Sequence, residues 1–408
     1  MPRIAVIGAG AAGCFCTAEL RRLLPEAAVD VYEAGPKPLA KVAITGGGRC
    51  NLTNSFQGIR SLAEAYPRGE RLMKRLLKVF SQEDACRWFE AAGVPLVLQD
   101  DHCVFPRSQD AMDIVRALLR RMEGAHLRLR TPVQSVMPVQ SVMPGQSVMP
   151  GLTEHLEVDG TPYDAVVVTT GGAPKGLPLL EGLDLEWVPT VPSLFTFTIQ
   201  DARLRTLMGL VTEAAVSLPG TAFKAEGPLL ITDWGLSGPA VLKLSAYAAR
   251  HLAGCGYKAP LGVNWTGRPE EEVRNSLRSL ADSHPQKQVS NTPPEGLQGR
   301  LWAYLMGKAG IRADIRWAEL GSKGLNRLVA ILTQDAYPIA GKTRFREEFV
   351  TAGGVALSNL DPATLQSRKY PGLFFAGEVL DIDAITGGFN LQAAWTTGYV
   401  AAHAIAAL

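Results

Sequence analysis

The amino-acid sequence predicts an α/β protein built on a Rossmann-like domain, with a smaller antiparallel β domain and a helical unit following it. An apolar run at residues 4–7 leads directly into the glycine-rich turn GAGAAG at 8–13, and a helical pattern follows. From about residue 190 the pattern changes to short alternating segments typical of antiparallel strands, and residues 269–333 are mostly helical. Strand-like segments after residue 336 then bring the chain back towards the first domain.

The first 33 residues predict a dinucleotide site. Gly8 permits the tight turn after the first strand, Gly10 lets the backbone approach a pyrophosphate, and Gly13 lets the helix pack close to the strand. The helix N-terminus faces the phosphate charge. Glu33 lies 20 residues after Gly13, where a carboxylate accepts hydrogen bonds from a ribose diol and repels a 2′-phosphate. The alternative is a purely structural glycine turn. The residues expected at the turn are Gly8, Gly10, Ala11, Ala12 and Gly13.

Length and composition set the limits on the protein class. The chain has 408 residues, which predicts two or three domains, and its net charge of +2 demands neither nucleic acid nor an anionic membrane surface. No signal peptide and no apolar run long enough to span a membrane are evident. Six cysteines are scattered without metal-like spacing. We therefore expect a cytoplasmic protein with no disulfide framework and no metal.

A second glycine-rich stretch follows the predicted site. Three consecutive glycines at 46–48 form a loop of low side-chain bulk with many exposed N–H groups, which suits close approach to a ligand; a plain flexible loop is the alternative. Lys41 is placed to reach a phosphate or the cofactor's ribityl chain, with a solvated lysine as the alternative. The candidate residues here are Lys41, Gly48, Arg49, Cys50, Asn51 and Thr53.

The next segments alternate between helices and strands. Residues 70–92 predict two helices, with Ser81 as the N-cap of the second, and Ser108 is expected to cap another. Residues 95–99 and 102–106 predict a hairpin, and 127–133 a further strand. The sequence QSVMP occurs three times between 134 and 150, which predicts a duplicated hairpin extension or a short interaction ribbon. The apolar run at 166–168 predicts a buried parallel strand that ends at Thr170 and Gly171, where such sheets bind ligands.

The C-terminal stretch favours FAD over NAD. A buried strand at 373–376 ends in Gly377 and Glu378, whose carboxylate is placed to accept hydrogen bonds from ribityl hydroxyls. Gly388 then opens a small-residue helix that runs from about Asn390. The N-terminus of that helix would stabilise negative charge on the reduced flavin by about 0.3–2 kcal/mol.

At these motifs the chain resembles the bacterial FAD-dependent flavoproteins of the BaiN and YhiN-like family, which includes an aminoacetone oxidase. The matching segments cover most of the chain in order. They are GAGAAG at 8–13, TGGGRCNLTN at 45–54, WFEAAGVPLVLQDDHCVFPRSQDA at 88–111, GLSGPAVLKLS at 235–245, VTAGGV at 350–355 and GLFFAGEVLDIDAITGGFNLQAAWTTG at 372–398.

The resemblance implies a domain arrangement and a set of cofactor contacts. It implies a discontinuous FAD-binding domain at 1–190 and 345–408, an inserted β-barrel domain at 191–266 and 334–344, and a helical insert at 267–333. Glu33 would hold the adenosine ribose, with Val133 beside the adenine. Lys41, Asn51 and Thr53 would line the FAD. The residues implied at the ribityl and isoalloxazine end are Glu378, Asp381, Asn390, Gln392 and Ala393.

Two positions depart from the family pattern. The family usually has glycine where Ala384 stands and tyrosine where Phe389 stands. If that glycine requires a positive φ, Ala384 implies an altered turn. If the tyrosine hydroxyl contacts substrate, Phe389 cannot replace it.

The function expected from the sequence is an FAD-dependent oxidoreductase that acts on a small organic substrate in a cleft between the FAD domain and the barrel. Neither a second GxGxxG in a strand–helix frame nor a CxxC pair is present, so NADH or NADPH would dock transiently, or oxygen would reoxidise the flavin. Arg49, Lys342 and Arg344 are candidates for binding an anionic substrate. Cys50 is either catalytic or structural. No general base is assigned, the oligomeric state is left open, and nucleic acid is not expected. The alternative is a non-catalytic, partner-dependent flavoprotein whose insert binds another macromolecule.

Overall fold

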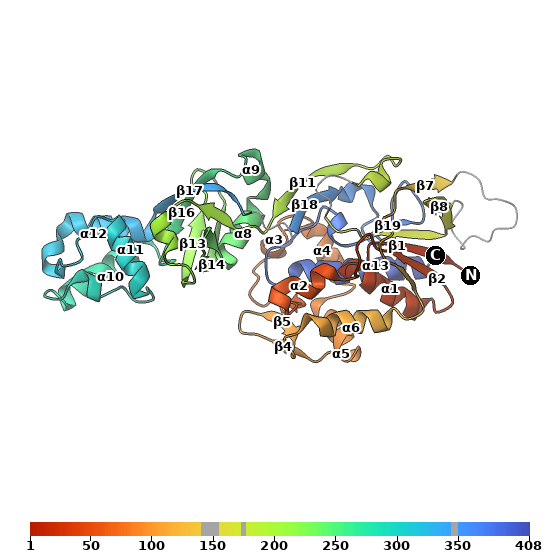
Figure 1. Ribbon diagram of the computed structural model, residues 1–408, viewed down its shortest axis with the longest axis horizontal. Helices are drawn as coiled ribbons and strands as arrows, with labels where there is room; N and C mark the ends of the chain where they lie inside the picture. The colour runs from red at the N-terminus through yellow and green to blue at the C-terminus, as the bar shows by residue number, and fades with distance from the viewer. Residues whose placement is uncertain (140–154, 173–176, 344–349) are drawn as a thin grey trace. The chain divides into compact units, whose positions relative to one another are not determined.

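The computed structural model describes residues 1–139, 155–172, 177–343 and 350–408, which form two compact units (Figure 1). Unit 1 contains residues 1–192 and 350–408, and unit 2 contains residues 193–349. The predicted boundaries between three domains stay predictions. No helix within the described ranges has both the length and the apolar character needed to cross a membrane.

Unit 1 is built around a five-stranded parallel sheet. Its strands are β1 (Arg3–Ile7), β2 (Ala28–Tyr32), β6 (His126–Arg128), β10 (Ala165–Val168) and β19 (Leu373–Phe375). Their order is β19-β10-β1-β2-β6, and the register places Ile7 between Tyr32 and Val168. This confirms the Rossmann-like prediction. Since the strands are parallel, their carboxyl ends meet at one edge, where open α/β sheets bind ligands.

Two helices from opposite ends of the chain pack together in this unit. They are α1 (Ala11–Leu23) and α13 (Phe389–Ala406). A Cβ atom at Gly398 would lie 2.7 Å from the carbonyl oxygen of Ala12, so the close contact requires glycine. Phe15 on α1 and Trp395 on α13 are fully buried, with ring centroids 5.5 Å apart. The small residues of α13 therefore allow it to pack closely against α1.

The helices α4 (Glu70–Leu76), α5 (Gln82–Ala91) and α6 (Ala111–Arg121) follow the expected pattern, with one correction at a cap. Ser81 caps α5 in a reciprocal capping box with Asp84, as predicted. The prediction that Ser108 caps α6 is wrong. Asp110 is the N-cap and accepts from the Met112 amide, while the Ser108 hydroxyl donates to Asp113. Asp110 directly precedes the first residue of α6, so its carboxylate reaches the amides of the first turn, which Ser108 does not cap.

Smaller sheets flank the core of unit 1. The predicted hairpin is β4 (Leu96–Leu98) with β5 (Cys103–Pro106), and β3 (Thr53–Asn54) extends it. β6 ends at Arg128, so the strand predicted for 127–133 is too long. The first QSVMP copy contributes β7 (Val136–Val139), which pairs antiparallel with β8 (His155–Val158) and then β9 (Thr161–Tyr163). The other two copies lie outside the described residues. The remaining elements are α2 (Ala40–Gly48), α3 (Leu62–Ala65), η1 (Pro178–Leu180), β11 (Trp187–Ser193), β18 (Val350–Val355), η3 (Leu357–Asn359) and η4 (Gly377–Val379).

Unit 2 contains a closed six-stranded barrel with strand order β12-β15-β14-β13-β16-β17. The strands are β12 (Phe197–Ile199), β13 (Val211–Ser217), β14 (Lys224–Ile231), β15 (Gly235–Ser237), β16 (Ala259–Asn264) and β17 (Asp335–Lys342). The helices are α7 (Ala202–Arg205), α8 (Pro239–Tyr247), α9 (Ala249–Gly254), α10 (Glu270–Ser283), η2 (Val289–Asn291), α11 (Gly299–Lys308) and α12 (Trp317–Thr333). The closed strand order confirms the β-barrel that the resemblance implies. One continuous hydrophobic core joins the barrel and the helices.

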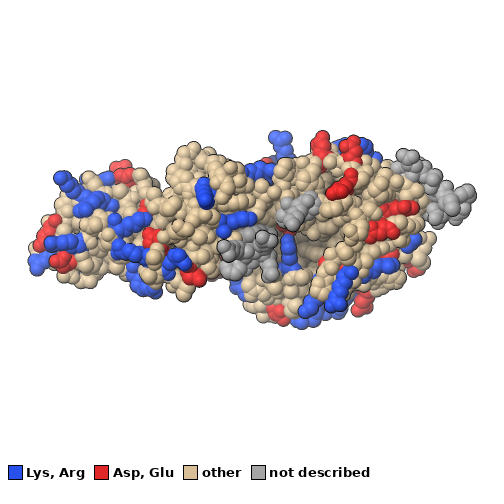
Figure 2. Space-filling view, turned by 45° about the horizontal axis from the view of Figure 1, so that its top comes forward, with Lys and Arg blue, Asp and Glu red and all other residues tan. Residues whose placement is uncertain are grey.

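Charge is divided unevenly between the units. Residues 193–349 contain 19 Lys and Arg against 14 Asp and Glu, whereas the rest of the chain contains 22 against 25. On the visible face, both signs are interspersed among uncharged side chains (Figure 2). The small net charge of the whole chain therefore conceals a positive unit 2.

Candidate functional site

The predicted dinucleotide turn lies at the carboxyl edge of the parallel sheet. Gly8 has φ +108°, and a Cβ atom there would lie 2.5 Å from the carbonyl oxygen of Thr169 at the end of β10. A Cβ atom at Gly13 would lie 1.9 Å from the Gly8 carbonyl oxygen. Gly10 differs, because a Cβ atom there would meet no described atom within 4 Å. Gly8 and Gly13 are thus needed by the fold itself, and Gly10 borders open space where a ligand fits.

Glu33 is held against this turn. Its carboxylate accepts hydrogen bonds from the Ala9 amide at 3.0 Å and the Gly35 amide at 2.6 Å. The Thr131 amide donates to the Glu33 carbonyl at 2.9 Å, which brings the chain leading to Val133 to the same end of β2. The hydrogen bonds from Ala9 and Gly35 fix the orientation of the half-buried Glu33 carboxylate at the position expected for a ribose contact.

Glu378 lies where β10, β18 and α2 approach the same edge. Its carboxylate accepts from the Thr351 amide at 2.7 Å and lies 3.6 Å from the Lys41 ammonium. A Cβ atom at Gly172 would lie 2.8 Å from the same carboxylate, next to the predicted residue Gly171. Thr351 was not predicted, because only the tertiary fold brings β18 to this edge.

The N-terminus of α13 forms the other side of the site. Gly388 is its N-cap with φ +90°, and a Cβ atom there would lie 2.5 Å from the Thr53 carbonyl oxygen. The Asn390 side chain accepts from the Ala384 amide at 2.9 Å and donates to its carbonyl at 3.0 Å. Ala384 is buried and is absent from the positive-φ residues of the described chain. Alanine is therefore accommodated, because this turn does not use the left-handed region.

Thr53 and Gln392 are fully buried and bonded to each other. The Thr53 hydroxyl donates to the Gln392 carbonyl oxygen at 2.6 Å, and the Gln392 amide donates to Thr396 at 3.0 Å. Ala393 follows in the first turn of α13 with 7% exposure. These side chains join β3 to α13, so they position the N-terminus of that helix.

The glycine-rich stretch is part helix and part left-handed turn. α2 spans Ala40–Gly48, and the glycine loop predicted at 46–48 lies at its end. Helical geometry nevertheless breaks at Thr45, and Gly46 and Gly47 have φ of +59° and +68°. Positive φ continues at Gly48 and at Cys50, where φ is +59°. A non-glycine residue in this region stores strain of the kind found at binding sites.

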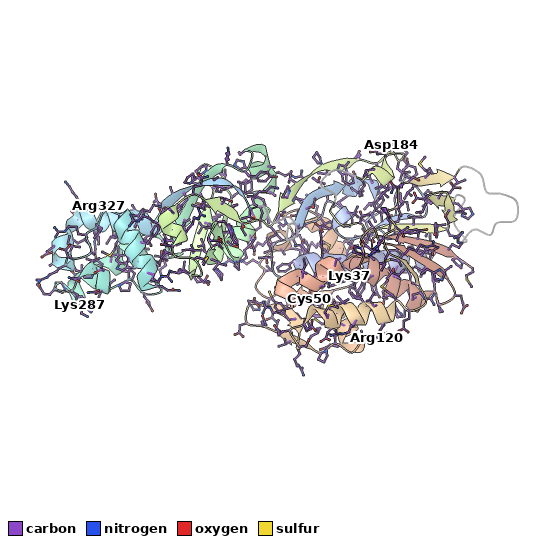
Figure 3. The ribbon with its side chains drawn as sticks, viewed as in Figure 1. Lys37, Cys50, Arg120, Asp184, Lys287 and Arg327 are labelled. Carbon is purple, nitrogen blue, oxygen red and sulfur yellow. The ribbon has the colours of Figure 1, made fainter. Side chains whose placement is uncertain are left out.

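Arg49 and Cys50 point to different environments. The exposed Arg49 guanidinium lies over the Phe105 ring, 4.7 Å from its centroid, and donates to the Gly46 carbonyl oxygen. Cys50 is fully buried in the core of unit 1 (labelled in Figure 3). Burial raises the pKa of the Cys50 thiol to about 12. A thiol held protonated is a poor nucleophile, which favours the structural interpretation of Cys50.

Iodoacetamide at pH 8 is expected to modify Cys255 and to leave Cys50 unmodified in the folded protein. Cys255 is exposed. With a pKa of about 12, Cys50 has a thiolate fraction of about 10⁻⁴ at pH 8, which rises about tenfold per pH unit until the thiol titrates. Peptide mass mapping after timed labelling measures both rates, with Cys255→Ser as control. Labelling of Cys50 as fast as Cys255 would contradict the buried assignment.

The sequence assigned no role to four residues near α13, namely Phe56, Tyr66, Arg68 and Asp383. The Tyr66 hydroxyl donates to the Phe389 carbonyl at 2.9 Å, and the Phe389 ring packs edge-on against Phe56. Asp383 is fully buried and forms an ion pair with Arg68 through two hydrogen bonds. Asp381 is half-buried, and its amide donates to Val355. In the sequence, Arg68 is marked only by its position next to Pro67, which is too weak a pattern to assign it a role.

The residues at this edge fit an FAD. Within the described residues, the buried oxygen Oδ1 of Asn51 and the hydroxyl of Thr170 have no hydrogen-bond partner. Buried polar atoms without partners are uncommon, and a cofactor bound at this edge would supply partners for these two. The carboxyl edge of the sheet therefore offers a free acceptor at Asn51, a free hydroxyl at Thr170 and open space at Gly10. The residues that would hold the cofactor are those of the Gly8–Gly13 turn, Glu33, Asn51, Thr170, Glu378 and the first turn of α13.

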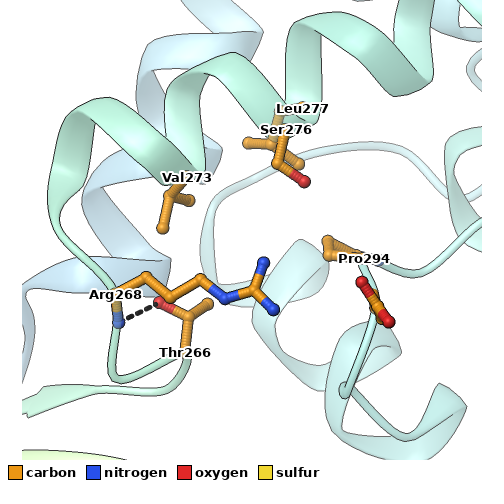
Figure 4. A pocket seen from close by; sticks show the side chains of 7 residues that line it. Thr266, Arg268, Val273, Ser276, Leu277 and Pro294 are labelled. Carbon is orange, nitrogen blue, oxygen red and sulfur yellow. Dashed lines mark hydrogen bonds between the residues drawn. The ribbon is translucent and has the colours of Figure 1, made fainter.

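A small cavity in unit 2 is too small to hold a cofactor. Thr266, Arg268 and Pro294 are among its lining residues, and its volume is about 20 Å³, enough for a single water (Figure 4). Lys342 was predicted to bind an anionic substrate, and its ammonium lies over the Tyr257 ring, 4.8 Å from the ring centroid. Arg344 lies outside the described residues. Among those residues no cluster of three His, Cys, Asp or Glu side chains is suited to a metal.

Comparison with known proteins identifies the family. The family described as "HI0933-like protein Rossmann domain" matches residues 2–404. The chain belongs to the HI0933-like family. This HI0933-like protein is an FAD-dependent oxidoreductase, which confirms the resemblance seen in its motifs and does not favour the non-catalytic alternative.

Three curated relatives span nearly the whole HI0933-like chain. It is 30% identical to the ribosomal RNA dihydrouridine synthase of Escherichia coli, over 98% of this chain and 96% of that protein. It is 29% identical to the 3-dehydro-bile acid delta(4,6)-reductase of Clostridium scindens, over 100% and 99%. The Haemophilus influenzae ribosomal RNA dihydrouridine synthase is 28% identical, over 98% and 97%. Among solved structures, the 3-ketosteroid delta1-dehydrogenase of Sterolibacterium denitrificans aligns over 100% of both chains at 14% identity, with a TM-score of only 0.47.

Proposed function

We propose that the protein is an FAD-dependent reductase that saturates a carbon–carbon double bond conjugated to a carbonyl group. The observation that supports this is the shared chemistry of two differently named relatives. Dihydrouridine is uridine whose C5=C6 bond, conjugated to the C4 carbonyl, has been reduced. A delta(4,6)-reductase acting on a 3-dehydro bile acid reduces double bonds conjugated to the C3 ketone. Both reactions add a hydride and a proton across an activated double bond.

The residues of unit 1 supply binding and electrostatics for this reaction. FAD, when bound, supplies the hydride-transfer chemistry. The Gly8–Gly13 turn and Glu33 would hold the adenosine half, and the N-terminus of α13 behind Gly388 would face the flavin half. Backbone N–H groups at that terminus favour negative charge by about 0.3–2 kcal/mol. They therefore stabilise the reduced cofactor relative to the oxidised one.

NADH or NADPH is the proposed source of electrons. The sequence has one GxGxxG in a strand–helix frame, so a nicotinamide nucleotide would dock transiently at the flavin rather than in a domain of its own. Reoxidation by oxygen and a cytoplasmic location stay predictions. The sequence also predicts a small organic substrate and no nucleic acid. The proposed chemistry depends on neither, because uracil in RNA and a small enone both satisfy it.

Anaerobic mixing of the flavin-loaded protein with NADPH or NADH is expected to bleach the flavin absorbance near 450 nm, and adding the correct acceptor should restore it. The acceptor panel contains a uridine-rich RNA, free uridine, a steroid dienone and its saturated analogue as control. Recovery with a conjugated acceptor but not with its saturated analogue supports the proposal. Recovery with oxygen alone, and with no conjugated acceptor, would contradict it and favour an oxidase.

A further inference from the structure

A surface pocket of about 260 Å³ lies in unit 1, away from the dinucleotide turn, and four arginines surround it. Arg21 and Arg22 come from the last turn of α1, and Arg120 and Arg121 come from the last turn of α6 (Arg120 is labelled in Figure 3). Trp88 of α5 is a half-buried part of the lining. The complete lining is Ala18, Glu19, Arg21, Arg22, Trp88, Arg120, Arg121 and Glu123.

Three of the arginines use only part of their hydrogen-bonding capacity within the described residues. Arg21 donates to the carbonyl oxygens of Ala27 at 2.9 Å and Glu123 at 3.3 Å. Arg120 and Arg121 each donate one hydrogen bond to a carbonyl at the end of α5, at 3.3 Å and 2.7 Å. Since a guanidinium has five N–H donors, each retains several for a ligand.

The two carboxylates of the lining do not cancel this charge. Glu19 is 1% exposed and accepts from Arg22, from the Trp88 indole at 2.7 Å and from His403 at 3.2 Å. Burial alone would raise the pKa of Glu19, but the hydrogen bonds from Arg22 and Trp88 outweigh burial and lower it. Glu19 therefore neutralises Arg22 and fixes the Trp88 ring. Arg21, Arg120 and Arg121 are left opposite the single exposed carboxylate of Glu123.

Arginines in the last turn of a helix have an ordinary role, which is to complement the helix dipole and bond its final carbonyls. That role accounts for Arg120 and Arg121, which bond carbonyls at the end of the neighbouring helix α5. It does not require side chains from two helices to border a single hollow beside an indole ring. Forked guanidinium donors around a hollow are the arrangement that recognises phosphate oxygens.

The location of the pocket limits what can occupy it. The N-terminus of α1 is at the dinucleotide turn, and Arg21 and Arg22 are near the other end of this 13-residue helix. At 1.5 Å per residue, that separation is about 15–18 Å. A ligand that reacts at the carboxyl edge and also reaches this pocket must therefore be long.

We propose that this pocket binds a backbone phosphate of a nucleic acid. The proposal goes beyond the proposed reaction and does not depend on it, because binding is measured without turnover. A phosphate on a free nucleotide has the same local chemistry, so the experiment must separate the two sources. RNA is the polymer to test, since two relatives act on ribosomal RNA by name.

The test is fluorescence anisotropy of the holoprotein with a labelled, uridine-containing 20-nucleotide RNA, in a salt series. Arg120→Gln with Arg121→Gln removes two pocket charges. Arg87→Gln with Arg116→Gln is the matched control, because it removes two exposed arginines, one from the adjoining helix α5 and one from α6, which carries the pocket pair. The pocket pair should weaken binding roughly tenfold at low salt and reduce the salt slope by about 0.7, the value for one phosphate of a single strand. The control pair should change affinity less than about twofold, and Arg120→Lys with Arg121→Lys should restore only part of the binding, because an ammonium keeps the charge without the forked donors.

Equal loss in both pairs, unchanged affinity in the pocket pair, or no RNA binding by the wild-type holoprotein would overturn the proposal. Uridine monophosphate and inorganic phosphate are added as competitors. Competition by the mononucleotide at concentrations matched to the RNA phosphates would also overturn it, because the pocket would then be a free-nucleotide site. Reduction of a small enone by the same variants is measured separately. Failure of the proposed reaction would appear there, and failure of this inference would not.

Discussion

Replacing Gly10 with alanine is expected to weaken FAD binding about 100-fold, which corresponds to about 2.7 kcal/mol of binding free energy. The apoprotein should stay as stable as wild type. Gly10 has φ −83° and ψ −166°, which alanine adopts without strain. The added Cβ atom would meet no described atom within 4 Å, so the fold tolerates it. It would instead occupy the space through which a pyrophosphate approaches the backbone. Titration of apoprotein with FAD measures the affinity, and circular dichroism gives the apoprotein Tm.

Two further glycines separate cofactor loss from damage to the fold. Gly13→Ala should prevent folding of unit 1, because its Cβ atom would lie 1.9 Å from the Gly8 carbonyl oxygen. Gly254→Ala should change neither property, since it also adds a Cβ atom into open space, at the end of α9 in unit 2. If Gly10→Ala binds FAD like the wild type, the turn does not hold the pyrophosphate.

Replacing Asp383 with alanine is expected to lower the free energy of unfolding of unit 1 by about 3–5 kcal/mol. Asp383 is fully buried, and its carboxylate forms two hydrogen bonds with Arg68, which is 14% exposed. Removing the carboxylate leaves a nearly buried guanidinium without its counter-charge. Urea unfolding of the apoprotein, followed by tryptophan fluorescence, measures the change.

The double replacement Arg68→Met with Asp383→Leu is the informative companion. Replacing a buried ion pair by apolar side chains of similar volume is often close to neutral, so most of the lost stability should return. Surface-pair variants such as Arg87→Gln should stay within about 0.5 kcal/mol of wild type. A loss below about 1 kcal/mol in Asp383→Ala would show that water replaces the carboxylate at this position.

The sequence predicted the elements whose signals are local. The strand, turn and helix around Gly8–Gly13 follow from three neighbouring glycines in a hydrophobic pattern, and the packing roles of Gly8 and Gly13 agree with the structure. The pyrophosphate role of Gly10 stays a prediction. The capping box of Ser81 and Asp84 depends on positions three residues apart. Its counterpart at Ser108 failed because Ser108 and Asp110 are both good N-caps, and only the backbone geometry selects between them.

Contacts between distant segments were not predicted, because nothing in either segment marks its partner. The Arg68 and Asp383 pair joins the loop before α4 to the loop before α13. Thr351 contacts Glu378 through a backbone amide, which any residue other than proline would supply. The Gln392 side chain bonds Thr53, which is far from it in the sequence, and Thr396; the cofactor contact implied for Gln392 stays a prediction. The arginine pocket combines the ends of α1, α5 and α6, which are separate in the sequence.

The sequence by itself determined the Rossmann-like domain, the dinucleotide turn, the family and thereby the FAD, because glycine conformations and strand–helix periodicity act over a few residues. Only the tertiary structure decided which glycine faces open space, which buried polar atoms lack partners, and where arginines from two helices surround one hollow. Those properties depend on distances between segments far apart along the chain. Chain folding sets those distances, and local residue preferences do not.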